Sequence, residues 1–355
     1  MRVWCDTEPA KKEDNVNQSI EAMDAPAVNH RGLKSQMLSQ KVIVFGIFVL
    51  VFIVFSVFLP GFRRIDNVLT LLQNVAILGI LGLGMSIVVI GRGIDISMIA
   101  ALAVPPGILL QMVQNGHSVT LSLTSAVTVA IVFGLANGWL VAFAEVPSLF
   151  TTLASGLFLA GFGQVFFFQL DVVQWNARLG ELSWLGQGSL LGIPKPVVMF
   201  VIVAVALTWL LRTTRFGALI YAIGDNPSGA RVTGISTRPV IVLQYLLAAL
   251  IGAFAGLVMA ASIDSMPTRV FNSTLIYDVV LVVVLGGIGL SGGRGGVSNV
   301  VIGTLLIGTL LNGMTIMDMS YSAQNFVKGL ILLSAVIFDS FANPRNEETS
   351  QQGDI

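Results

Sequence analysis

Long stretches without a single charged side chain are the feature that most restricts how this chain of 355 residues can fold. Such stretches cover residues 42–62, 68–91, 96–144, 146–170 and 239–263. A helix needs about 20 apolar residues to cross the hydrocarbon core of a membrane, so the stretch 96–144 has to cross it twice. The sequence therefore predicts an all-α membrane protein that crosses the membrane many times.

Composition agrees with this class, because 55% of the residues are hydrophobic and only 11% are charged. Soluble domains contain about 25% charged residues, with which they cover a globular surface. We expect about ten transmembrane helices, near residues 42–60, 68–90, 95–114, 119–143, 148–168, 196–211, 239–262, 276–291, 296–317 and 323–340. They form one transmembrane domain over 42–340, between a polar tail 1–41, expected to be disordered, and a polar tail 341–355.

The distribution of basic residues predicts the orientation of the chain in the membrane. With the N-terminus in the cytoplasm, thirteen Lys and Arg residues fall on the cytoplasmic side and five on the opposite side. Loops rich in Lys and Arg stay in the cytoplasm, so this orientation is favoured. An even number of spans then places the C-terminus in the cytoplasm as well.

Residue types that catalytic and metal centres need are scarce in this chain. One cysteine and two histidines exclude a disulfide framework and Cys or His metal sites. The glycines Gly287, Gly289 and Gly292 have the spacing of a dinucleotide motif, but they follow an apolar run of membrane-span length, so a tight turn explains them better. The chain has no G-x-x-x-x-G-K-[ST] phosphate loop, and its zero net charge gives no indication of a nucleic-acid partner. We expect neither catalysis nor a metal or cofactor bound by this chain.

One polar segment, residues 212–238, separates two apolar runs and carries four arginines against the single acid Asp225. Its middle predicts a short helix, in which Asp225 or Asn226 caps the N-terminus, Pro227 takes the first position and Gly234 ends it. A helix of under two turns is not stable in water by itself. We interpret the segment as a docking surface for another protein; an ordinary positively charged loop is the alternative.

Polar side chains inside the apolar runs are candidates for a solute path, because such groups are costly at membrane depth. Pro105 and Pro106 should break or kink their helix, and the carbonyls thus freed need a neighbour or a cavity. Asp278 is expected near the outer end of its span in contact with water, and Lys328 is expected to reach toward an interface. The candidate path residues are Gln73, Asn74, Pro105, Asn137, Asp278 and Asn312. Plain kinks and helix–helix hydrogen bonds are the alternative.

Five motifs in order carry a resemblance to a known family: QNVAILGILGLGMSIVVIGRGIDIS, GLANGWLV, VPSLFTTLASG, TRFGALIYAIGDNPSGARVTGI, and Asp278 eight residues before GGIGLSGGRGG. From about residue 40 to 340 the chain resembles the membrane permease subunit of bacterial ABC importers for monosaccharides, of the ribose, xylose and galactose type. It departs from the family pattern at Arg92, where a glycine is usual, and at Gly229, where an alanine is usual.

The resemblance implies a permease of the bacterial inner membrane that imports a monosaccharide or similar polyol. It also implies three partners: a cytoplasmic ABC ATPase subunit that holds ATP and Mg, a periplasmic sugar-binding protein, and a second permease copy or paralogue. The ATPase would dock on the segment 212–238, through Arg215, Gly224, Asp225, Asn226, Pro227, Ala230, Arg231 and Gly234. Two alternatives to this function are a secondary carrier driven by an ion gradient and a membrane enzyme that acts on lipid.

Overall fold

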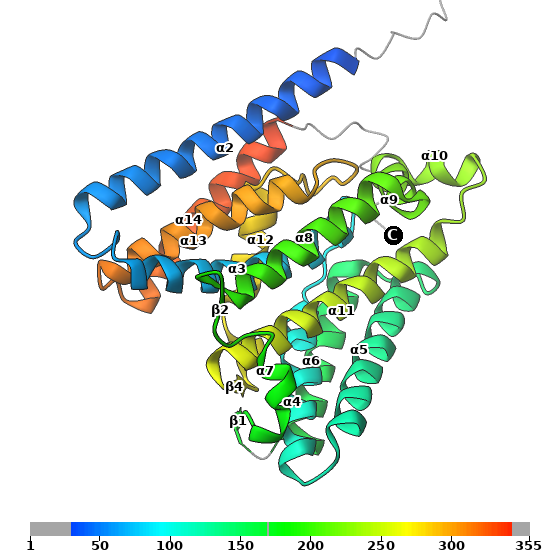
Figure 1. The fold of residues 1–355 in the computed structure, drawn as a ribbon. Coiled ribbons are helices and arrows are strands. Elements are labelled where there is room, and N and C mark those ends of the chain that lie inside the picture. The colour runs from blue at the N-terminus through cyan, green and yellow to red at the C-terminus, as the bar shows by residue number, and fades with distance from the viewer. Residues whose placement is uncertain (1–29, 169, 343–355) are drawn as a thin grey trace, which may run out of the picture. The chain divides into compact units, whose positions relative to one another are not determined.

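The computed structural model describes residues 30–168 and 170–342, and these ranges are mainly helical (Figure 1). The chain divides into two compact units, Met1–Gln40 and Lys41–Ile355. The predicted tails 1–41 and 341–355 lie largely outside the described residues, and the first described helix begins at His30.

Within the described ranges, a helix stands at each of the ten predicted spans. They are α2 (His30–Phe58), α3 (Ile65–Ile90), α4 (Met98–Gln114), α5 (Val119–Ala142), α6 (Ser148–Phe166), α8 (Lys195–Thr213), α11 (Thr237–Ile263), α12 (Leu275–Leu285), α13 (Val297–Ile316) and α14 (Tyr321–Ala342). Seven of these helices are long and apolar enough to cross a membrane. The all-α membrane fold expected from the apolar runs is therefore confirmed.

The shortest of the ten helices is α12, with 11 residues. Its length is about 16 Å at 1.5 Å per residue, roughly half the thickness of the hydrocarbon core. The predicted span continued to residue 291, but the helix ends at Leu285 because two glycines follow. A Cβ atom at Gly286 would overlap the carbonyl oxygen of Asn299, and Gly287 has a φ of 88° that favours glycine.

Two small antiparallel strand pairs lie in the segments between the long helices. Strand β1 (Val172–Gln174) pairs with β4 (Ser265–Pro267), and β2 (Ser189–Leu190) pairs with β3 (Ile193–Pro194). The first pair joins the segment after α6 to the segment after α11, with Val173 opposite Met266. Three short helical turns complete these segments: η1 (Ala177–Leu179), α7 (Gly180–Ser183) and η2 (Val270–Asn272).

Helix α3 occupies the core of the second unit. Its side chains are buried almost without interruption from Val75 to Ile90, and it packs against α8, α11, α12 and α13. In a bilayer the lipid tails are as apolar as these side chains, so close packing rather than burial from water holds such helices together. A helix enclosed on all sides therefore needs small residues at its contacts.

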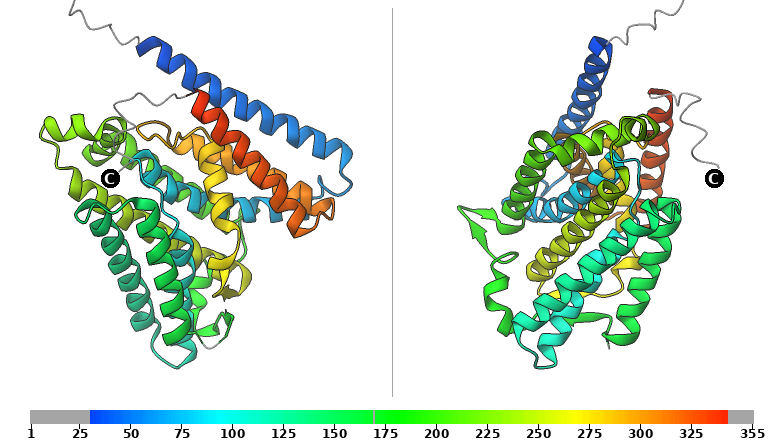
Figure 2. Two further views of the ribbon diagram at one scale, coloured as in Figure 1. Left: turned by 180° about the vertical axis from the view of Figure 1, so that it is seen from behind. Right: turned by 90° about the vertical axis from the view of Figure 1, so that its right-hand side faces the viewer.

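Two pairs of glycines with G-x-x-x-G spacing, Gly134–Gly138 and Gly252–Gly256, provide close helix contacts around α11. Figures 1 and 2 show α5 and α11 side by side, and a Cβ atom at Gly138 of α5 would lie only 2.6 Å from the Cα atom of Val242. On another side of α11, a Cβ atom at Gly256 would overlap the carbonyl oxygen of Leu102 in α4. The pairs thus serve as tight packing sites, the static role of such motifs.

The same contact accounts for one of the two prolines inside α4, Pro106. Of the two predicted outcomes, a break or a kink, the break does not occur, because α4 is continuous from Met98 to Gln114 through Pro105 and Pro106. Proline removes the N–H that the Leu102 carbonyl would accept, which is the usual reason for a break. Here Gly256 of α11 covers that carbonyl directly, so a neighbouring helix protects the freed acceptor.

Candidate functional site

The polar segment between α8 and α11 folds into two short helices, α9 (Arg215–Asp225) and α10 (Pro227–Val232). The side chain of Thr214 caps α9, accepting a hydrogen bond from the Gly217 N–H at 3.2 Å. Helix α9 was not among the elements expected from the sequence. The sequence pattern that could have predicted α9 is the three-residue spacing of the apolar residues Ile220 and Ile223, which is typical of an amphipathic helix. Both side chains are buried in the structure.

Asn226 begins α10 as the sequence predicted. Its Oδ1 atom accepts a hydrogen bond from the Gly229 N–H at 2.8 Å, and Pro227 takes the first helical position. Of the two residues that could form this cap, the structure thus selects Asn226 rather than Asp225, which is the last residue of α9. The short capped helix is confirmed.

The end of α10 is also closed by hydrogen bonds. The Ile235 N–H donates to the Ala230 carbonyl and the Gly234 N–H donates to the Arg231 carbonyl, both at 3.0 Å. Gly234 has a φ of 83°, the left-handed conformation that this type of helix end requires. With both ends satisfied, α10 presents an exposed face on which Val232 is 88% exposed. An exposed apolar side chain on a fixed short helix suits contact with another protein.

Gly224 is where α9 meets two other segments of the chain. A Cβ atom at this position would overlap the carbonyl oxygen of Ile90, at the end of α3, and would lie 2.5 Å from the amide nitrogen of Gly293. The Gly293 N–H in turn donates a hydrogen bond of 2.7 Å to that Ile90 carbonyl. Backbone touches backbone here, so there is no room for any side chain.

Arg92 strengthens this junction with its guanidinium group. Its Nε donates to the Ser291 carbonyl at 2.7 Å and its Nη2 donates to the Asp225 carbonyl at 3.3 Å. Asp225 ends α9, and a cation is favourable at the C-terminal end of a helix. The φ of Arg92 is 69°, a conformation that is costly for residues other than glycine. From the sequence, Arg92 was visible only as a departure from the family pattern, because its partners are far away in the chain.

Asp95 lies in the turn between α3 and α4. Its carboxylate accepts hydrogen bonds from the backbone N–H groups of Ser97 and Met98 and from the Ser97 hydroxyl. The side chain is 1% exposed, and this burial raises the pKa of Asp95 to about 6. The Asn137 amide donates to the same Ser97 hydroxyl at 2.8 Å. Asn137, one of the candidate path residues, therefore connects α5 to the turn between α3 and α4.

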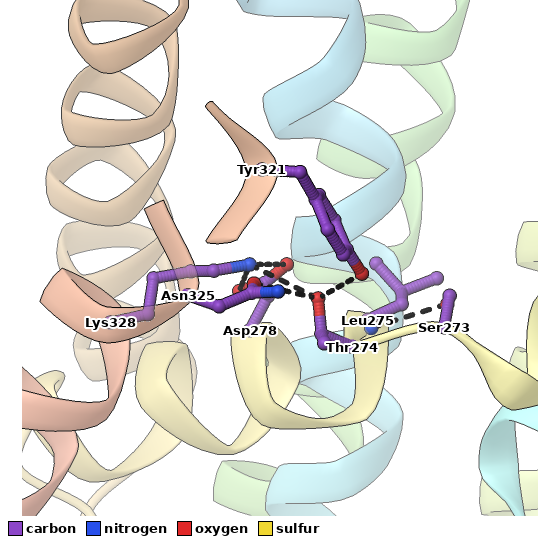
Figure 3. Close-up of polar contacts among 7 residues, drawn as sticks. All are labelled: Ser273, Thr274, Leu275, Asp278, Tyr321, Asn325 and Lys328. Carbon is purple, nitrogen blue, oxygen red and sulfur yellow. Dashed lines mark hydrogen bonds and ion pairs between the residues drawn. The ribbon is translucent and has the colours of Figure 1, made fainter. Parts of the chain in front are cut away.

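Asp278 and Lys328 form a buried ion pair between α12 and α14 (Figure 3). The Lys328 Nζ lies 2.9 Å from the Asp278 Oδ1, and the two side chains are only 9% and 10% exposed. Asp278 does lie in the first turn of its helix, as expected, but its carboxylate and the Lys328 ammonium are largely buried against each other rather than in contact with water or an interface. The two residues are 50 positions apart in the chain, so a local sequence pattern could not predict their pairing.

Thr274 connects this pair to the beginning of α14. Its hydroxyl lies 3.2 Å from the Lys328 Nζ, 3.0 Å from the Tyr321 hydroxyl and 3.3 Å from the Asn325 Oδ1 (Figure 3). Tyr321 is 61% exposed, so the cluster runs from a buried ion pair to an open edge.

The other candidate path residues do not come together. Gln73 of α3 donates to the Ser262 hydroxyl of α11, and Asn312 of α13 exchanges hydrogen bonds of 2.9 and 3.0 Å with Asn67. Asn74 is exposed. The amides that do pair each join two helices at a separate place, so the contacts support the helix–helix role of these residues.

Comparison with known proteins decides which family has this architecture. Residues 67–336 match the family described as branched-chain amino acid transport system / permease component. The chain belongs to this family. The match begins in α3 and ends in α14, so it covers nine of the ten helices that stand at the predicted spans.

Several relatives of this permease carry the names of sugars. It is 36% identical over 295 residues to the ribose import permease protein of Bacillus subtilis, covering 83% of this chain and 90% of the relative. It is 32% identical to the galactofuranose transporter permease protein of Escherichia coli, covering 80% and 83%. It is 30% identical to the L-arabinose ABC transporter permease protein of Azospirillum brasilense, covering 94% and 96%. No solved structure matches the chain at a significant level.

Gly229 shows how the permease departs from its expected pattern. A Cβ atom at this position would lie 3.1 Å from the Asn226 Cγ atom, close to the side chain that caps α10. Alanine favours a helix by about 1 kcal/mol over glycine, but here it would press on the cap. Glycine therefore leaves space for the capping side chain.

Proposed function

We propose that this permease imports a monosaccharide or similar polyol across the bacterial inner membrane, driven by ATP that a separate ABC ATPase subunit hydrolyses. The observation that carries the proposal is α10, a capped helix that presents an exposed face and is tied through α9 to the end of α3. The sugar names of the relatives support this solute class.

The ATPase docks on the α9–α10 surface in this proposal. The contacts separate its residues into two groups. Gly224 and Asp225 fix the position of the surface, whereas Asn226, Pro227, Ala230 and Gly234 shape α10. Arg215 and Arg231 are exposed and available to acidic groups of the ATPase. ATP and Mg belong to that subunit, since this chain carries no phosphate-binding motif.

The opposite face receives solute from a periplasmic binding protein, and a second permease copy or paralogue completes the path. Both termini then lie in the cytoplasm, in line with the distribution of basic residues. Of the candidate path residues, Asp278 has the most suggestive surroundings, because its cluster includes hydroxyl, amide and ammonium groups and has an open edge.

Asn226→Pro is expected to abolish uptake while the protein still inserts into the membrane. Proline lacks both the capping side chain and the N–H that Asn226 donates to the Ala222 carbonyl at 3.2 Å. It also cannot adopt the φ of −149° found at this position. The measurement is a pull-down of the chain from its native membrane in mild detergent, with mass spectrometry of the proteins that accompany it.

Asn226→Asp provides the matched control, because an aspartate can still accept the Gly229 N–H. An ATPase with Walker motifs should accompany the wild type and Asn226→Asp and be lost from Asn226→Pro. The proposal would be wrong if the chain came down alone while uptake continued and collapsed with an uncoupler. That result would identify a carrier driven by an ion gradient.

A further inference from the structure

A pocket of about 450 Å³ lies where the end of α5 meets the loop from α10 to α11. It is lined by Phe143, Arg231, Ile235, Ser236, Thr237, Arg238 and Pro239. The pocket is separate from the junction at Gly224 and from the Asp278 cluster. Two of its side chains are cationic, which gives it an electrostatic character of its own.

The charge of the pocket is net positive. Arg238 and Arg231 are exposed at its rim, and Glu145 is the acid that contacts Arg238, with its Oε1 3.1 Å from the arginine Nη2. The paired side chains are 51% and 61% exposed, and ion pairs at such positions are weak. A guanidinium has five N–H donors, so Arg238 can bind a second anion without losing Glu145.

The beginning of α11 adds donors that the described part of the chain leaves unused. Ser236 stands at the N-cap but makes no side-chain hydrogen bond to the helix, so the first N–H groups of α11 are uncapped. Thr237 is only 6% exposed, and its hydroxyl has no hydrogen-bond partner among the described residues. N–H groups at the start of a long helix, together with its dipole, favour a bound anion.

Two aromatic side chains beside the pocket indicate the source of that anion. Trp139 and Phe143 stack at 6.5 Å near the end of α5, with 54% and 45% of their surfaces exposed. The Arg238 guanidinium lies 5.4 Å from the centre of the Phe143 ring. Exposed tryptophans at the end of an apolar helix are typical of the level of the lipid headgroups. A carboxylate of a soluble partner would not need this aromatic neighbourhood.

We propose that this pocket binds the phosphate of an anionic phospholipid. Arg238, the Thr237 hydroxyl and the first N–H groups of α11 hold the phosphate, while Phe143 and Trp139 contact the adjoining glycerol and acyl carbons. Basic pockets between transmembrane helices at the cytoplasmic surface are suited to such headgroups. The bound lipid would lie directly beside α10.

The test is native mass spectrometry of the full-length chain in neutral detergent, with added phosphatidylglycerol or phosphatidylcholine. The wild type is expected to retain phosphatidylglycerol selectively. Arg238→Gln and Thr237→Val should each weaken that retention by about fivefold, the effect of one basic group or one hydrogen bond. Thr237→Val keeps the shape and the charge, so it tests the hydroxyl alone.

Arg269→Gln is the matched control, because Arg269 also forms an exposed ion pair, at 2.7 Å from Asp171, but in another part of the chain. It should retain the lipid as the wild type does. Equal losses from Arg238→Gln and Arg269→Gln would show a general charge effect and overturn the proposal. Displacement of the lipid by equimolar inorganic phosphate would assign the pocket to free phosphate instead. Loss of a protein partner from Arg238→Gln in a pull-down, with lipid retention unchanged, would assign it to that partner.

Discussion

Asp278→Asn is expected to lower the free energy of unfolding by about 3 to 5 kcal/mol, the usual cost of breaking a buried ion pair. The substitution leaves the ammonium of Lys328 at 7% exposure without its counter-charge. Since Lys328 also contacts Thr274 at 3.2 Å, the loss should spread to the connection between α12 and α14. Thermal unfolding of the purified permease in detergent measures the effect, and uptake into cells should fall with it.

The double variant Asp278→Asn with Lys328→Met separates lost charge from lost shape. Removing both charges avoids an uncompensated ion, so this variant should recover most of the stability that the single substitution loses. Asp171→Asn offers a second control, because its pair with Arg269 is 66% and 60% exposed and should contribute less than about 1 kcal/mol. If the single and double variants unfolded at the same temperature, the pair would not be what holds α12 to α14.

Gly224→Ala is expected to separate α9 from the end of α3 and to prevent capture of the ATPase. The added Cβ atom would overlap the Ile90 carbonyl oxygen, and backbone cannot move aside as a flexible side chain can. Overpacking of this kind costs about 1 to 3 kcal/mol, with roughly 1 kcal/mol more if the Gly293 hydrogen bond to Ile90 breaks. The permease should remain folded and yet bring down at least about tenfold less ATPase, the effect of 1.4 kcal/mol or more.

Gly161→Ala is the matched control for this substitution. Gly161 lies in α6, and a Cβ atom there would meet nothing within 4 Å. Alanine should therefore stabilise the helix slightly, by up to about 1 kcal/mol, without any effect on ATPase capture. Normal capture by Gly224→Ala would refute the idea that this junction positions α10.

Local signals explain what could be predicted from the sequence. The apolar runs predicted the transmembrane helices, because the length of a run and its lack of charged residues can both be read within a single segment. The caps of α10 were readable for the same reason, since Asn226 and Gly234 act on backbone groups a few residues away. The family resemblance rested on similar short motifs, and the family match over residues 67–336 confirms it.

Contacts between distant segments explain what could not be predicted. Nothing in a single sequence pairs Asp278 with Lys328 or places Gly224 against Ile90 and Gly293. The two prolines of α4 suggested a break or a kink. The sequence alone does not show that Gly256 of α11 covers the Leu102 carbonyl that Pro106 leaves free. For the same reason the candidate path residues stay predictions: helix faces in a glycine-rich bundle follow from packing, which a linear pattern does not encode.

The enclosed position of α3 has a consequence for how the chain is made. It is the second of the ten helices to leave the ribosome, yet its packing partners α8, α11, α12 and α13 are all synthesised later. Helices insert into the bilayer individually before they associate, so α3 has to remain in contact with lipid or the insertion machinery until α13 arrives. A chain truncated before α13 would keep α3 facing lipid on one side, with its small residues exposed. The most central part of this permease is therefore among the last to be completed during biosynthesis.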